Sequence, residues 1–413
     1  MIMDDAQGRA ASISFRQLKL FESIGRLKSV RRASEECSLS QPAVTQALAK
    51  LEEQVGVTLV DRRASGSYLN ELGEMFHARV ERFFDQIEFA MTELGVPGGP
   101  GAVKLVARRL SRSQVRALIA IVETGSFAQG AEVLGLSQAS LQRAARDLES
   151  NLRKPLFYRT AAGIMVTPAG LEFGRRMKVA LQEIDWGIRE LEPTWGGFSR
   201  QIVIGAMPSG GSVLLACALD EFLRTHPQAD VRIVTENAAE MLRKLRAGDA
   251  DFVIGLLPEQ PVPDLISEAF APTPYSIVGR RGHPLMRKGS VSVDDLLGYD
   301  WVVGNHGASR RACFDTLFAG QRGPQAPIMT CALPVIRHLL ARSDRLTLMT
   351  SYELMHEDDG LSAVMYGPIL PVPTIGVTMR ENWKPTSLHA DFIEILRRHM
   401  TSAAVQPKLR EVG

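Results

Sequence analysis

The 413-residue chain has few cysteines and no long apolar run. Its four cysteines show no CxxC spacing, which argues against a zinc ribbon or a disulfide scaffold and is typical of a reducing compartment. No apolar run approaches the ~20 residues of a transmembrane helix, and the first eleven residues lack the apolar core of a signal peptide. We therefore expect a cytoplasmic protein with no membrane partner.

Motifs for catalysis and for cofactor binding are also missing. The glycine-bearing segment 205–212 has no Lys-Ser/Thr pair, so it is not a P-loop. The chain has no HExxH motif and no nucleophile elbow, and the acidic run 356–359 fits a loop better than a metal site. We expect no enzymatic activity, no metal and no other cofactor.

The net charge of +2 is unevenly distributed along the chain. Residues 1–100 carry 12 basic and 14 acidic residues, residues 101–200 carry 15 and 9, and the remainder carries 21 and 23. The basic surplus of residues 101–200 includes Arg108, Arg109, Arg112 and Arg116. Such local charge suits a polyanionic partner, although solvated surface arginines are the alternative interpretation.

The most informative feature that is present is an internal repeat with an offset of 97 residues and no gap. The pairs of identical residues at this offset include Ser40 and Ser137, Gln41 and Gln138, Leu51 and Leu148, Glu52 and Glu149, Leu59 and Leu156, Arg62 and Arg159, and Gly73 and Gly170. A unit of this size is too large for a solenoid repeat and right for a small domain. The chain therefore carries one small domain twice.

Each copy predicts three helices. Apolar residues spaced by three at the start of each copy predict the first helix. Short second helices are expected over 30–37 and 127–134, with Ser29 and Ser126 as N-caps. A three-residue turn then leads into a third helix that starts at Gln41 or Gln138. Two short helices joined by such a turn form a helix-turn-helix.

The polar face of the third helix is a candidate DNA-binding surface. Its side chains can hydrogen-bond base edges in a major groove, and a helix N-terminus favours a phosphate. A solvated face on a helical bundle is the alternative. The candidate DNA contacts on this helix are Ser40, Gln41, Pro42, Thr45, Gln46 and Lys50 in copy one, and Ser137, Gln138, Gln142, Arg143 and Arg146 in copy two.

The segments after the third helices favour the DNA interpretation. Residues 59–70 and 156–167 each predict a strand, a polar turn and a second strand. Such a hairpin is a wing, and Arg62, Arg63 and Arg159 are placed to reach phosphates.

Long amphipathic helices are expected after the wings, over 71–94 and 168–192, because apolar residues recur there every three or four positions. Each helix can pack into the core of its own copy. We also expect the two helices to pair antiparallel within one chain and to form a pseudo-dimer. The Gly/Pro-rich segment 96–105 is predicted to be a helix-breaking link that permits the reversal.

The repeated domain resembles the winged helix-turn-helix of LysR-type transcription regulators. The resemblance rests on the runs from Ala33 to Arg62 and from Ser126 to Gly170. Copy one departs from the family pattern in its core, at Lys28, Cys37 and Val60, whereas copy two departs in the reading helix, over 139–142. The resemblance implies a bacterial regulator with two such domains, at 12–95 and 106–194, that binds double-stranded promoter DNA as a homodimer or higher homo-oligomer. RNA polymerase is a further candidate partner.

Residues 199–403 alternate between short apolar strands and helices, which predicts a parallel sheet covered by helices. This part resembles the family's effector-binding domain, an α/β fold with two lobes like a periplasmic binding protein. The resemblance implies lobes over about 199–269 with 372–403 and about 270–371, joined by crossing segments near 268–273 and 368–373.

Ligands of such lobes bind beyond the C-terminal ends of strands. The candidate effector contacts in these loops are Pro208, Ser209, Gly210, Ser212, Asn305, His306, Ser309 and Thr330. Hydroxyls and backbone N–H groups there suit a small-molecule effector of the sugar or carboxylate type, and ordinary loop and cap chemistry is the alternative. The competing function is an α/β solute-binding or catalytic domain whose helical modules serve only oligomerisation.

Overall fold

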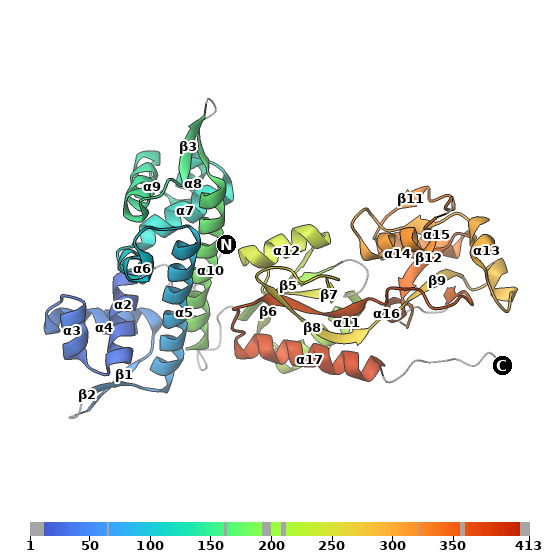
Figure 1. Cartoon of the computed structure of the whole chain (residues 1–413). Helices are drawn as coiled ribbons and strands as arrows, with labels where there is room; N and C mark the ends of the chain where they lie inside the picture. The colour runs from blue at the N-terminus through green and yellow to red at the C-terminus, as the bar shows by residue number, and fades with distance from the viewer. Residues whose placement is uncertain are drawn as a thin grey trace. The chain divides into compact units, whose positions relative to one another are not determined.

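The computed structural model divides the chain into two compact units, Met1–Ser199 and Arg200–Gly413. It describes residues 12–63, 66–160, 163–191, 200–207, 212–320, 322–355 and 360–404. Figure 1 shows the elements of both units.

The two copies of the repeat fold alike. Each has three helices, a two-stranded antiparallel wing and a long helix. Copy one comprises α2 (Phe15–Leu27), α3 (Val30–Glu36), α4 (Gln41–Val55), β1 (Val60–Arg63), β2 (Gly66–Leu69) and α5 (Glu71–Glu93). Copy two comprises α7 (Arg112–Thr124), α8 (Phe127–Leu134), α9 (Gln138–Leu152), β3 (Phe157–Thr160), β4 (Gly163–Val166) and α10 (Pro168–Glu190).

The repeated glutamate fixes the wing to the third helix. Glu52 Oε1 accepts hydrogen bonds from the backbone N–H groups of Leu59 (2.8 Å) and Val60 (3.2 Å). In copy two, Glu149 does the same for Leu156 and Phe157, at 2.7 and 3.0 Å. A carboxylate thus satisfies two donors at the start of each wing, which explains why this residue is present in both copies.

The repeated glycine lets the long helix approach the wing. A Cβ at Gly73 would lie 2.1 Å from the carbonyl oxygen of Leu59, and a Cβ at Gly170 would lie 2.5 Å from that of Leu156. Neither backbone could accept a side chain there without moving. The N-cap residues lie three positions earlier, where the side chains of Asn70 and Thr167 accept hydrogen bonds from the N–H groups of the two glycines.

The predicted helix-breaking Gly/Pro link over 96–105 is correct only for residues 96–98. Helix α6 (Gly99–Ala107) forms there, because Gly98 adopts a left-handed conformation (φ 107°) and Pro100 occupies the tolerated first turn. Val103 and Ala107 bury their side chains in the core of the unit. The connection between the copies is therefore a packed helix.

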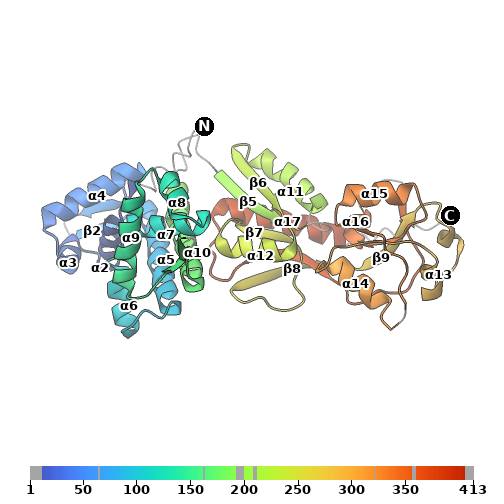
Figure 2. The ribbon, with the colours of Figure 1, turned by 90° about the horizontal axis from the view of Figure 1, so that it is seen from above.

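Helices α5 and α10 pack side by side (Figures 1 and 2). They are antiparallel, as expected, because Arg79 in the N-terminal half of α5 binds Glu183 and Glu190 in the C-terminal half of α10. One continuous apolar core contains residues of both copies, from Ile13 in copy one to Leu191 after α10. A smaller cluster around Phe127 and Leu141 belongs to copy two. The two winged helices thus share one core.

The second unit begins with a five-stranded sheet in the order β6-β5-β7-β14-β8. Its elements are β5 (Arg200–Ala206), α11 (Ser212–Thr225), β6 (Ala229–Thr235), α12 (Ala238–Ala247), β7 (Phe252–Leu256), β8 (Leu265–Pro272), β14 (Thr374–Arg380) and α17 (Ser387–Ala404). Helices α11 and α17 cover one face and α12 covers the other.

The prediction of a parallel sheet holds for part of this sheet. Strands β6, β5 and β7 are parallel, whereas β14 runs antiparallel to both β7 and β8. The sequence interpretation assigned 268–273 to a crossing segment and missed that most of it lies in β8. The sheet is mixed because the chain passes from β8 into the second lobe and re-enters the sheet through β14, in the opposite direction.

The second lobe contains a three-stranded antiparallel sheet, in the order β12-β9-β13, and a parallel pair, β10 and β11. Its elements are β9 (Tyr275–Arg280), η1 (Pro284–Arg287), α13 (Val293–Leu297), β10 (Val302–Val303), α14 (Ser309–Leu317), β11 (Ile328–Met329), α15 (Leu333–Ala341), β12 (Thr347–Thr350), α16 (Ser351–Met355) and β13 (Leu361–Ala363). The two segments that cross between the lobes meet where Thr273 N–H donates to the Pro373 carbonyl at 2.8 Å.

Candidate DNA-binding faces and effector site

The predicted reading faces of α4 and α9 lie at the surface. Gln41, Pro42, Thr45, Gln46 and Lys50 are exposed on α4, while Val44, Leu48 and Leu51 on its opposite side are buried. This division follows from apolar residues at a spacing of three and four on a helix that packs on one side. A polar stripe of this kind can enter a major groove.

Helix α9 has the same division. Gln138, Arg143 and Arg146 are exposed and Gln142 is half-buried, whereas Leu141, Ala145 and Leu148 are buried. Arg143 and Arg146 give this face two guanidinium groups that can contact a polyanion.

Ser40 and Ser137 have a structural role at the N-termini of these helices. Each is the N-cap, and its hydroxyl oxygen accepts a hydrogen bond from the N–H of Ala43 or Ser140. The caps hold the first helical turn in place, so the backbone N–H groups there are oriented toward a ligand beyond the helix end.

The wings place further polar residues beside these helices. Arg159 and Tyr158 of β3 are exposed, and Tyr158 is a residue that the sequence interpretation missed. Its counterpart in copy one is Asp61, which is exposed on β1. Arg62 and Arg63 belong to β1, and their side chains lie outside the described part of the chain.

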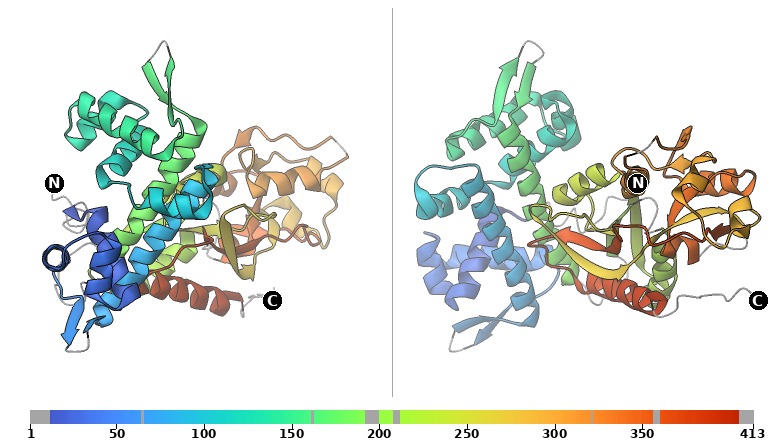
Figure 3. Two further views of the ribbon diagram at one scale, coloured as in Figure 1. Left: turned by 60° about the vertical axis from the view of Figure 1, so that its left-hand side comes forward. Right: turned by 45° about the vertical axis from the view of Figure 1, so that its right-hand side comes forward.

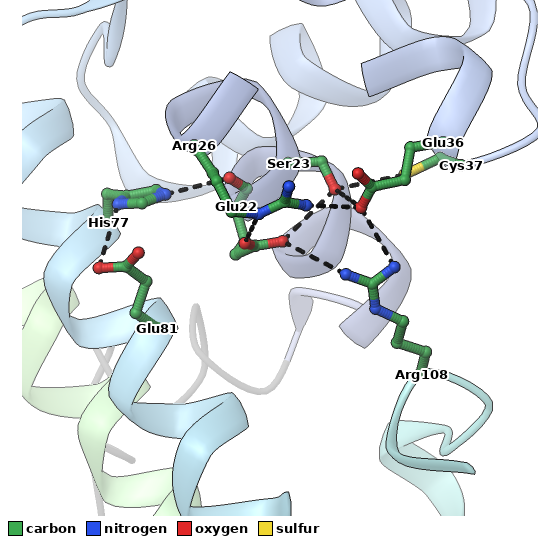
Figure 4. Close-up of polar contacts among 8 residues, drawn as sticks. All are labelled: Glu22, Ser23, Arg26, Glu36, Cys37, His77, Glu81 and Arg108. Carbon is green, nitrogen blue, oxygen red and sulfur yellow. Dashed lines mark hydrogen bonds and ion pairs between the residues drawn. The ribbon is translucent and has the colours of Figure 1, made fainter. Parts of the chain in front are cut away.

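A cluster of charges joins copy one to the segment that leads into copy two (Figure 4). Arg26 on α2 binds Glu22 and Glu36, each at 2.6 Å, and Arg108, directly after α6, binds Glu36 at 3.1 Å. Ser23 Oγ also donates to Glu36 at 3.0 Å. The hydrogen bond from Arg26, with help from Ser23 and the charge of Arg108, lowers the pKa of Glu36 to about 2. The cluster fixes α2, α3 and the connector to one another.

A buried charge network crosses the α5–α10 seam. Arg79 is fully buried and binds Glu183 at 2.9 Å and Glu190 at 2.5 Å. Arg82 and Gln86 of α5 also donate to Glu183, at 3.0 and 2.8 Å. Burial lowers the pKa of Arg79, but the hydrogen bonds and charges of Glu190 and Glu183 raise it above its ordinary value overall. The guanidinium therefore stays charged inside the seam.

A second buried ion pair lies at one edge of the second lobe. Arg310 Nη2 donates to Glu353 Oε1 at 2.7 Å, and both side chains are 2% exposed. Arg310 lies on α14, which follows β10, and Glu353 lies on α16, which follows β12. Thr350 donates two further hydrogen bonds to the Glu353 carboxylate, from its backbone N–H and from its hydroxyl. Burial raises the pKa of Glu353 against the charge of Arg310.

The guanidinium of Arg310 has hydrogen-bond donors that the ion pair with Glu353 does not use. Its Nε and Nη1 atoms are buried and have no hydrogen-bond partner within the described residues. Ser309, the first residue of α14, contacts the Tyr275 hydroxyl at 3.3 Å, and Ala308 at the N-cap provides no side-chain cap. Burial raises the pKa of Tyr275 to about 12, so the hydroxyl stays protonated at neutral pH. Unpartnered buried donors of this kind call for an acceptor.

The predicted effector residues are partly brought together. Strands β10 and β11 are parallel, so Asn305, His306 and Ser309 after β10 and Thr330 after β11 lie at the same edge. Asn305 and His306 are exposed, and Thr330 Oγ1 accepts from Ala332 N–H at 3.1 Å. Pro208, Ser209 and Gly210 lie outside the described residues, as does the side chain of Ser212.

Sequence reasoning missed Arg310, Tyr275 and Glu353 at this edge. Arg310 stands beside Ser309 and Arg311 in a polar helix start, so the local sequence gives no signal that its side chain is buried. Its partner Glu353 is 43 residues away, and nothing in the local pattern connects the two.

Comparisons with known proteins agree with this architecture. Residues 15–74 and 112–171 each match the model of the bacterial regulatory helix-turn-helix protein, lysR family, and residues 196–401 match the LysR substrate binding domain. The chain is 32% identical to the HTH-type transcriptional regulator GalR of Pseudomonas putida over 346 residues, which cover 83% of this chain and 85% of that protein. It is 31% identical over 209 residues to the regulator GbpR of Rhizobium radiobacter, covering 50% and 69%.

The fold is shared with a solved full-length OxyR variant from Pseudomonas aeruginosa, with a TM-score of 0.51 and 21% identity over 73% of this chain and 98% of that one. No helix within the described residues has the length and apolarity to cross a membrane. Two helix-turn-helix matches in one chain agree with the tandem winged helices seen in the structure. The chain thus belongs to the LysR family of transcriptional regulators, with two winged helix-turn-helix domains and one effector-binding domain.

Proposed function

We propose that both winged helices bind promoter DNA, with α4 and α9 in successive major grooves and the wings on the flanking backbone. The observation that carries this proposal is the pair of exposed polar faces on α4 and α9, held on one shared core. Base contacts are assigned to Gln41, Thr45, Gln46, Gln142 and Arg143, and phosphate contacts to Lys50, Arg146, Arg159, Arg62 and Arg63.

Salt dependence tests the DNA proposal. Binding to labelled genomic promoter fragments should weaken steeply as salt rises, because each phosphate contact releases about one counterion. Replacing Arg146 and Arg159 together by alanine should lower the log–log salt slope by about 2, whereas the matched pair Arg224→Ala and Arg243→Ala, on helices of the second unit, should leave it unchanged. No salt-sensitive binding at low ionic strength would refute the proposal and favour modules that serve only oligomerisation.

We further propose that the effector is a small carboxylate that binds at the lobe edge defined by Ser309, Tyr275 and Arg310. The support is the pair of unpartnered donors on buried Arg310 beside the first turn of α14. Guanidinium N–H groups form charge-assisted hydrogen bonds with carboxylate oxygens, so a carboxylate matches the open Nε–H and Nη1–H donors in charge and hydrogen-bonding capacity. Neutral sugars offer no charge to Arg310 and are the weaker candidates.

A thermal-shift screen of the full chain with small carboxylates and neutral sugars tests this site. A carboxylate at about 100 times its Kd should stabilise the protein by about 2.7 kcal/mol. The stabilisation should be lost in Arg310→Lys, which keeps the charge beside Glu353 but removes the two open N–H donors. It should persist in Arg311→Met, whose partner Asp315 is a surface residue of the same helix. Equal stabilisation of both variants would refute the assignment.

The family membership supports a regulator that is not an enzyme and acts in the cytoplasm, where promoter DNA lies. We propose that effector binding shifts the equilibrium between arrangements of the DNA-binding modules, which requires different affinity for the two states. Homo-oligomer formation and contact with RNA polymerase belong to this proposal.

A further inference from the structure

We propose that a single chain carries a complete two-headed DNA-reading unit, that its α5–α10 seam rejects pairing between like copies, and that the unit occupies two half-sites of different sequence. The inference rests on the proposed DNA binding. Beyond that proposal, one polypeptide reads both half-sites of the operator, and the two half-sites differ in sequence.

The first argument is steric. A Cβ at Gly187 of α10 would lie 2.9 Å from a ring carbon of Phe76 and 3.0 Å from Cβ of Arg79, both on α5. The repeat places Ala90 at the position in α5 that corresponds to Gly187. If an α5 helix took the place of α10, the methyl group of Ala90 would meet Phe76 and Arg79 at those distances, and symmetry would repeat the clash. Pairing of α5 with a second α5 is therefore disfavoured.

The second argument is electrostatic. Glu183 is buried and accepts from Gln86 at 2.8 Å, and the repeat makes these two residues counterparts of each other. In an α10–α10 pair, two buried Glu183 carboxylates would face one another at hydrogen-bond distance. In an α5–α5 pair, Gln86 would replace Glu183, so Arg79 and Arg82 would lose their shared carboxylate. Facing like charges and the loss of a carboxylate partner from a buried guanidinium are both costly, so the mixed pair is selected.

The third argument concerns the connection between the copies. Arg108, after α6, binds Glu36 of copy one at 3.1 Å, and Arg112, at the start of α7, donates to the Ile13 carbonyl at 3.1 Å (Figure 4 shows the Arg108 contact). These contacts fasten the beginning of copy two to copy one of the same chain. Exchange of one copy between chains would have to break them together with the seam.

The two reading faces held by this frame are chemically different. Gln46 on α4 corresponds to Arg143 on α9, and Lys50 corresponds to Asp147. Glutamine pairs bidentately with adenine and arginine with guanine, so equivalent positions of the two half-sites should differ. Asp147 also removes a basic residue where α4 has Lys50.

The arrangement of the unit suits two adjacent half-sites. In the views of Figures 1 and 3, the wings β1–β2 and β3–β4 project from opposite ends of the α5–α10 pair, and α4 and α9 lie along the same flank of it. Both reading helices can therefore face one duplex while the wings contact its outer backbone.

Selection of DNA by the full chain tests the inference. From duplexes with a random 40-base-pair core, the wild type should enrich two unlike half-sites. Gln46→Ala should relax one half-site and Arg143→Ala the other, each by roughly 10-fold in base preference at one position. Two identical half-sites, or both variants relaxing the same half, would overturn the inference while leaving DNA binding intact. Absence of any enrichment would overturn the proposed DNA binding itself.

A crosslink tests the seam without DNA. Phe84→Cys and Leu181→Cys together, on α5 and α10, should form a disulfide within one chain on mild oxidation. A mixture of the two single variants should give no crosslinked dimer above the level of each variant alone, which controls for the native cysteines. A dimer specific to the mixture would show exchange between chains and overturn the inference.

Discussion

Glu183 offers a quantitative test of the buried seam. Glu183→Gln keeps the shape of the side chain and removes the negative charge that Arg79 and Arg82 share, whereas Glu190 still binds Arg79. Loss of one partner of a buried ion pair costs about 3–5 kcal/mol. Because Arg79 keeps two hydrogen bonds to Glu190, we expect about 2–3 kcal/mol. For a unit of 199 residues, this corresponds to a decrease in Tm of roughly 4–12 °C.

Differential scanning calorimetry of the full chain can measure this change, with the transition of the second unit as an internal reference. The matched control is Glu172→Gln on the same helix, because Glu172 is exposed and binds Arg175 and Arg176 of its own helix. Such surface pairs contribute about 0–1 kcal/mol. A Glu183→Gln shift no larger than that of Glu172→Gln would show that the buried network does not stabilise the seam.

Two further predictions concern stability. Gly187→Ala should destabilise the first unit by about 1–3 kcal/mol through overpacking against Phe76, whereas Gly101→Ala on α6, which meets no atom within 4 Å, should be neutral or stabilise by up to about 1 kcal/mol; equal calorimetric shifts would contradict the packing argument. The pKa of Glu36 is depressed to about 2 from an ordinary 4.5, so its contribution is fully present above pH 4.5 and is lost as the pH falls toward 2. The free energy of unfolding from urea titrations should therefore fall more between pH 6 and pH 3 for the wild type than for Glu36→Gln, by about 1 kcal/mol after solvent screening. Parallel pH profiles would refute this.

Much of the first unit could be predicted from the sequence. Helical periodicity and the N-cap serines gave the starts of α4, α8 and α9 to the residue, because local rules govern them. The repeat also led to the expectation of an antiparallel α5–α10 pair. Helix α6 was missed because its glycines and proline look like a linker, and only burial of Val103 and Ala107 shows otherwise.

The charged residues inside the molecule could not be predicted in the same way. Arg79 lies 104 residues from Glu183, and Arg310 lies 43 residues from Glu353. Each pairing depends on how distant elements pack, which no local pattern encodes. Strand β8 was assigned to a crossing segment for the same reason, since its partner β14 begins about 100 residues later.

The covalent link between α5 and α10 also has a consequence for behaviour at low abundance. A DNA-reading pair assembled from separate chains dissociates when the protein concentration falls below its dimer Kd. Here the two helices belong to one polypeptide, so their pairing is unimolecular and its equilibrium does not depend on how many copies a cell holds. Two-headed recognition should therefore persist at dilutions that would leave a conventional dimer as single, weakly bound winged helices.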